Sequence, residues 1–115
     1  MAETAGNERR KVEPYVVQGS TLYVRLPQLT RDDAAFDKAC RSLLKADGPV
    51  YTVDMSAVKT ITSTFIGIVA VTYLDANSQG KRMLVKAPKR VLDVFRLAGF
   101  DGKVEMEEVP HVPAQ

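Results

Sequence analysis

The feature that most constrains this chain is an uncharged run of fifteen residues from Thr60 to Leu74. A membrane-spanning helix takes about 20 apolar residues, and this run is shorter and begins with several Ser and Thr side chains. We therefore expect a buried core element. Because a strand of this length would be unusual, we predict a helix over Ser63–Gln79 that ends at Gly80.

Short β-prone segments flank this predicted helix. They are Val50–Met55 (VYTVDM) and Arg82–Lys86 (RMLVK), and a strand-helix-strand unit of this kind forms a parallel crossover. Two earlier runs with β-strand character, Tyr15–Gln18 and Thr21–Leu26, surround the pair Gly19-Ser20. That spacing predicts a hairpin closed by a tight turn.

Two further helices are predicted from apolar residues that recur at helical spacing. The first has Thr30 as its N-cap and ends before Gly48-Pro49. The second starts at Pro88 and ends at Gly99, where a left-handed cap is needed. A short final strand is expected at Val104–Met106.

These elements predict a single α/β domain with a mixed four- to five-stranded sheet that opens with a hairpin. A length of 115 residues supports one core but not two. We place the domain at residues 14–107, after a flexible N-terminal arm at 1–13 and before a loose C-terminal tail at 108–115.

Composition excludes several classes of protein. Hydrophobic residues make up 45% and charged residues 26%, which is ordinary for a globular protein and unlike a disordered one. The formal net charge is +2 with both signs interspersed, so no strong field attracts nucleic acid or an anionic membrane surface. Cys40 is the single cysteine and no signal peptide is recognised, so we expect a reducing, cytoplasmic location.

Catalytic and metal-binding patterns are not found in the sequence. The single histidine, His111, lies in the Pro-rich tail, and Cys40 lies on an apolar helix face, where we expect it to pack in the core. Asp54 ends a predicted strand, where a lone carboxylate is usually a structural hydrogen-bond acceptor. No nucleotide-binding motif is present. We expect neither an enzyme nor a cofactor.

One segment has residues that suit a functional site. Three hydroxyl residues, Thr62, Ser63 and Thr64, precede the long apolar run, and Ser63 is predicted to be the N-cap of its helix. A structural role as a cap explains at least one of these hydroxyls. A phosphate on Ser63 would add about −1.5 to −2 charges at the end of a helix that favours negative charge.

These features resemble STAS domains, and among them bacterial anti-sigma factor antagonists. The resemblance is carried by the strand that ends at Asp54, the segment Thr62–Gly67, and the segments QGKRMLVKAP and VLDVFRLAGF. It covers roughly Tyr15 to Met106. It implies the STAS fold, a mixed sheet whose helices pack mainly on one face.

The resemblance also implies a function. In anti-sigma factor antagonists a partner that is both a serine kinase and an anti-sigma factor binds the unmodified protein and phosphorylates the motif serine, and a serine phosphatase resets it. Carried over, Ser63 is the phosphoacceptor, and Thr62, Ser63, Thr64, Phe65 and Ile66 form the docking surface. Here Thr62 stands where the family has Asp, and Phe65 where it has Gly.

Two other functions stay open. The chain is alternatively a STAS scaffold subunit that does not switch, in a stress-signalling assembly or a lipid-transport ATPase. A small-molecule or nucleotide sensor is a third hypothesis, because some STAS domains are reported to bind nucleotides. Fold alone does not decide between them.

Overall fold

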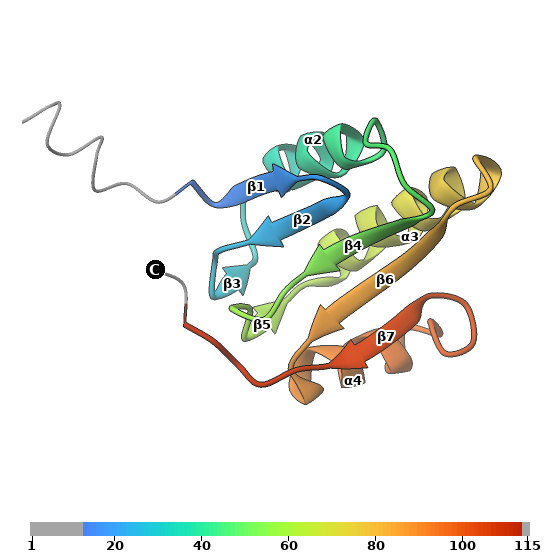
Figure 1. The fold of residues 1–115 in the computed structure, drawn as a ribbon. Helices are drawn as coiled ribbons and strands as arrows, with labels where there is room; N and C mark the ends of the chain where they lie inside the picture. Colours follow the sequence, from blue (N-terminus) through green and yellow to red (C-terminus); the bar gives the residue numbers. More distant parts are fainter. Residues whose placement is uncertain (1–12, 114–115) are drawn as a thin grey trace, which may run out of the picture.

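A computed structural model describes residues 13–113. Five strands form one mixed sheet in the order β1-β2-β4-β6-β7. Strands β2, β4, β6 and β7 run parallel to one another, and β1 is antiparallel to β2 at one edge (Figure 1). This arrangement confirms the predicted α/β fold class. The strands are β1 (Tyr15–Gln18), β2 (Thr21–Val24), β4 (Val50–Asp54), β6 (Arg82–Ala87) and β7 (Glu105–Glu108).

Three helices cover one face of this sheet, and they lie on its far side in Figure 1. They are α2 (Asp33–Leu43), α3 (Ser63–Ser78) and α4 (Lys89–Leu97). The strands alternate accordingly, because side chains on a strand point to opposite faces in turn. In β4, for example, Tyr51 and Val53 are buried while Thr52 is half-buried on the open face. The helices thus pack on one side, as predicted.

Local sequence explains how the elements begin and end. The hairpin turns at Gly19, whose φ of 58° lies in the left-handed region that favours glycine. Helix α4 ends at Gly99 with a φ of 89°, and the Phe100 N–H then donates to the Phe95 carbonyl at 3.1 Å. The Phe95 and Phe100 rings pack edge to face with centroids 5.1 Å apart. This is the predicted left-handed cap, and the ring contact is the hydrophobic contact that commonly accompanies such a cap.

Several predicted boundaries are wrong. Helix α2 begins at Asp33 after Asp32, which has a left-handed φ of 57°, so Thr30 is not its N-cap. The hairpin's second strand ends at Val24 rather than Leu26. The final strand lies at Glu105–Glu108. A second, two-stranded parallel sheet of β3 (Gln28–Leu29) and β5 (Thr60–Ile61) was not predicted, because two residues are too few to show alternation.

The last described segment is held to the domain. After β7, the Val109 N–H donates to the Ala87 carbonyl at 3.0 Å and the Val112 N–H to the Ser56 carbonyl at 2.9 Å. The tail that we expected to be loose from residue 108 therefore follows the sheet past the end of β4 (Figure 1). The predicted flexible arm at 1–13 lies outside the described residues, apart from Glu13.

Candidate functional site

The segment singled out by the sequence forms the start of α3. Thr62 is the N-cap, with an extended backbone (φ −96°, ψ 165°), and its carbonyl accepts the N–H groups of Phe65 and Ile66 at 3.1 and 3.2 Å. Thr62 is in turn tied to β3, because its N–H donates to the Leu29 carbonyl at 3.1 Å. Ser63 is the first residue of the helix, so the prediction that Ser63 is the N-cap is wrong.

The side chain at the N-cap position does not cap this helix end. The hydroxyl of Thr62 makes no cap hydrogen bond, and the first turn of α3 contains no acidic residue. The side chains of Ser63 and Thr64 are exposed, and Thr62 is half-buried. Two hydroxyls are therefore accessible beside open backbone N–H groups, at a helix end that favours negative charge.

The other two predicted docking residues belong to the core. Phe65 is 1% exposed and Ile66 is 6% exposed. The Phe65 ring packs against Phe36 of α2 with centroids 5.3 Å apart. In the folded domain neither residue offers surface to a partner, which corrects the expected docking surface to Ser63, Thr64 and half-buried Thr62 at this end of the helix.

Further along α3 the exposed residues are apolar. Gly67 is exposed one turn after Ser63, and Val71 and Leu74 are 57% and 61% exposed. Sequence reasoning missed these residues, because a helix that is apolar on nearly every side predicts complete burial. We call the exposed residues Ser63, Thr64, Gly67, Val71 and Leu74 the α3 strip.

A groove runs beside the α3 strip. It has a volume of about 460 Å³ and lies on the surface between α3 and α2. Thr64, Gly67 and Val71 line its α3 side, and Asp33, Asp37 and Arg41 line its α2 side. Asp37 is paired with Arg41, whose Nε lies 3.0 Å from the carboxylate, so Asp33 is the unpaired charge of this wall among the residues described.

The remaining reactive side chains have structural positions. Asp54 accepts the Ser56 N–H at 2.9 Å, which closes a turn after β4. Cys40 is buried, and burial raises the pKa of its thiol to about 12, so the nucleophilic thiolate is scarce. Within residues 13–113, no three His, Cys, Asp or Glu side chains gather as metal ligands would. None of the helices described there is both long enough and apolar enough to cross a membrane.

Comparison with known protein families identifies the family of this chain. A family model described as "Mlab, STAS domain" matches residues 27–108, which is more than half of the chain. No curated protein matches the sequence. The matched range extends from the start of β3 to the end of β7 and includes the whole of α3. The chain therefore belongs to the STAS domain family.

Proposed function

We propose that this chain is a regulatory binding module of the anti-sigma factor antagonist type, which docks a partner protein on the α3 strip and is switched by phosphorylation of Ser63. The observation that supports the proposal most directly is that Ser63 is exposed at the start of the helix face on which Val71 and Leu74 are also exposed. The resemblance suggests an anti-sigma factor with serine-kinase activity as the partner, and a serine phosphatase that resets the switch. The module itself is not an enzyme.

The switch follows from electrostatics at the start of α3. A phosphate on Ser63 would sit at the positive end of the helix dipole, near N–H groups that the Thr62 side chain does not cap, so the fold would tolerate it. A partner that packs apolar side chains against Val71 would have to desolvate the phosphate as well, which is costly without a paired cation. Binding would weaken while the domain stays folded.

The test compares three full-length baits in pull-downs from the native cell: wild type, Ser63→Asp, and Ser78→Asp as the matched control. Ser78 is exposed at the opposite end of the same helix, so its substitution introduces the same charge away from the site. We expect wild type and Ser78→Asp to recover a kinase-like anti-sigma factor that Ser63→Asp does not recover. Equal recovery of that partner by all three baits would refute the switch.

A second measurement addresses the modification. The purified chain is incubated with the recovered kinase and ATP, and phosphopeptides are mapped by mass spectrometry. We expect phosphate on Ser63. Modification at Thr64 or elsewhere would remove Ser63 from the centre of the proposal but would leave docking on the α3 strip intact.

The second candidate is a scaffold subunit that does not switch, in a stress-signalling assembly or a lipid-transport ATPase. It is favoured by the degree to which Val71 and Leu74 are exposed, because permanent interfaces are more apolar than transient ones. This candidate predicts a large, stable complex on size-exclusion of native lysate, recovered equally by wild type and Ser63→Asp. Elution of the chain by itself would contradict it.

A further inference from the structure

A second cavity has no lining residue in the α3 strip. This cavity of about 340 Å³ is lined by Val58, Lys59, Pro88, Arg90 and His111. These residues come from the three segments that follow β4, β6 and β7. Those strands are parallel neighbours, so their carboxyl ends meet at one edge of the sheet. Ligands of open α/β sheets bind outside this edge. We call this space the basic cavity.

The chain segments around the basic cavity are fixed by backbone hydrogen bonds. The Lys59 N–H donates to the Pro27 carbonyl at 2.6 Å. The tail is held on both sides of His111 by the bonds of Val109 and Val112, and the His111 Nε2 lies 3.2 Å from the Ala57 carbonyl. The histidine ring is therefore held in position as part of the cavity wall.

Among residues 13–113, the positive charge in the basic cavity has no acidic partner. No carboxylate is among its five lining residues, and neither Lys59 nor Arg90 forms an ion pair with any other residue between 13 and 113. Two cations brought together without an acid repel each other, and a bound anion would relieve that repulsion. The two cations are therefore arranged as in a site that binds an anionic ligand.

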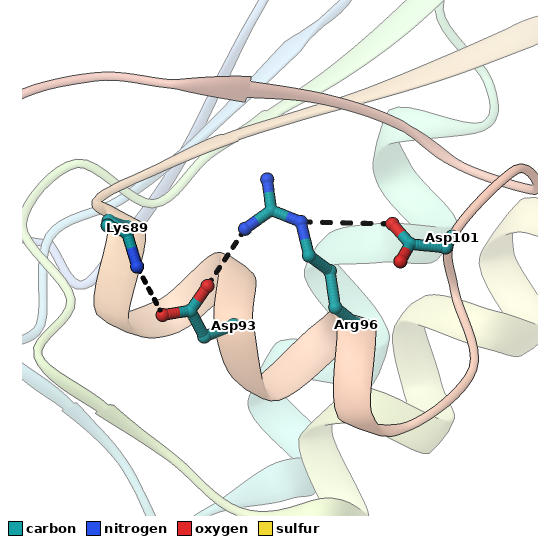
Figure 2. A network of polar contacts seen from close by, with 4 residues as sticks. All are labelled: Lys89, Asp93, Arg96 and Asp101. Atoms are coloured by element: carbon teal, nitrogen blue, oxygen red, sulfur yellow. Dashed lines mark hydrogen bonds and ion pairs between the residues drawn. The ribbon is translucent and has the colours of Figure 1, made fainter.

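The acidic residue of α4, Asp93, already forms ion pairs with other side chains. Figure 2 shows Asp93 between Lys89 at 3.0 Å and Arg96 at 2.9 Å. The hydrogen bond from Lys89, with that from Arg96, holds the pKa of Asp93 below its ordinary value. Arg96 also pairs with Asp101 at 3.7 Å. This network on α4 leaves Arg90 outside it, although Arg90 stands in the first turn of the helix, where acids are the preferred residues.

We infer that the basic cavity binds the phosphate group of a small ligand. Arg90 supplies a planar guanidinium, which matches two phosphate oxygens, and Lys59 supplies a second cation. Val58 and Pro88 give the cavity an apolar wall, which suits the carbon part of a phosphate ester. This site shares no residue with the α3 strip, so the inference does not rest on the proposed switch.

The test is an NMR titration of the full ¹⁵N-labelled chain with inorganic phosphate and with glycerol phosphate, at constant ionic strength. We expect saturable shifts of amide signals around Lys59, Arg90 and His111. Because hydrogen bonds to charged groups are stronger than those between neutral groups, Arg90→Ala and Lys59→Ala should each weaken binding about tenfold or more. The matched control is Lys45→Ala, which removes one exposed cation just beyond the end of α2, and its affinity should equal that of wild type.

Two outcomes overturn the inference: shifts that do not saturate, or equal affinities for Arg90→Ala and Lys45→Ala. Thermal unfolding of each variant confirms that the chain is folded before titration. A sedimentation arm uses vesicles of neutral phospholipid with and without an anionic phospholipid. Binding to anionic vesicles that Arg90→Ala abolishes identifies a lipid headgroup as the phosphate source, and binding to glycerol phosphate without sedimentation identifies a soluble ester.

Discussion

Gly67 follows Ser63 by one helical turn, and both residues are exposed on the outer side of α3. A Cβ atom added at Gly67 would meet nothing within 4 Å. The helix therefore carries a glycine where its own packing does not require one, in the wall of the groove beside α2. A close approach by a partner is a physical reason for leaving this position without a side chain.

The first prediction concerns Gly67→Ala. Because glycine within a helix is less stable than alanine by roughly 0.5–1 kcal/mol, the variant should unfold at higher urea concentration than wild type. It should also recover less partner in the pull-down, because the new methyl group narrows the groove. A variant that is more stable and binds equally well would remove Gly67 from the docking surface.

The second prediction tests whether the Ser63 side chain stabilises the helix as a cap or is only an accessible hydroxyl. Since its side chain is exposed and Thr62 holds the N-cap position, Ser63→Ala should change the free energy of unfolding by less than about 0.5 kcal/mol. Ser63→Asp should stabilise the domain by about 0.3–1 kcal/mol at low salt, through the helix dipole. Chemical denaturation at low and high salt measures both. A loss near 1 kcal/mol for Ser63→Ala would indicate a true cap.

The third prediction concerns the buried hydroxyl of Tyr51. It lies 2.9 Å from the Leu44 carbonyl, 3.1 Å from the Ala46 carbonyl and 3.2 Å from Oε1 of Gln79, so it joins β4 to the segment after α2 and to the end of α3. Tyr51→Phe should destabilise the domain by roughly 1–2 kcal/mol, because partly buried acceptors lose their donor. Urea denaturation measures this change. A neutral result would mean that water replaces the hydroxyl.

The fold was largely predictable because its elements have strong local signals. The β-rich run of β4, helical spacing in α4 and the glycine at 99 each agree with the observed structure. The failures come from tertiary contacts. The short strand pair β3–β5 and the bonds that hold the tail depend on partners distant in sequence, so no local pattern encodes them.

The site was predicted at its first residues only. Ser63 could be found from its hydroxyl neighbours, but burial of Phe65 and exposure of Val71 depend on how α3 rotates against α2 and the sheet. A helix that is apolar on every side does not reveal that rotation. The basic cavity was missed for a different reason. Lys59, Arg90 and His111 are far apart in sequence, and only the parallel strand order brings them to one edge.

The last prediction concerns alkaline stability and Cys40. The thiol pKa is about 12 in the folded chain, chiefly because of burial, against an ordinary value of 9.0. Between these values the unfolded chain loses the proton and the folded chain keeps it. Stability is therefore fully present below about pH 9 and falls as pH rises towards 12, by up to about 1.4 kcal/mol per pH unit from this group.

The measurement is urea denaturation of wild type and Cys40→Ala at a series of pH values above and below the ordinary thiol pKa. Cys40→Ala should be less stable than wild type at neutral pH, because a buried sulfur is lost from the core. That difference should shrink as pH rises, since only wild type carries the thiol. Burial also raises the pKa of Tyr15 to about 12, and this main cause is the same in both proteins. The charge on Cys40 is the smallest of the three causes of the Tyr15 shift, and it is the one that Cys40→Ala removes. A difference that stays constant with pH would show that the thiol becomes ionised in the folded chain as readily as in the unfolded one.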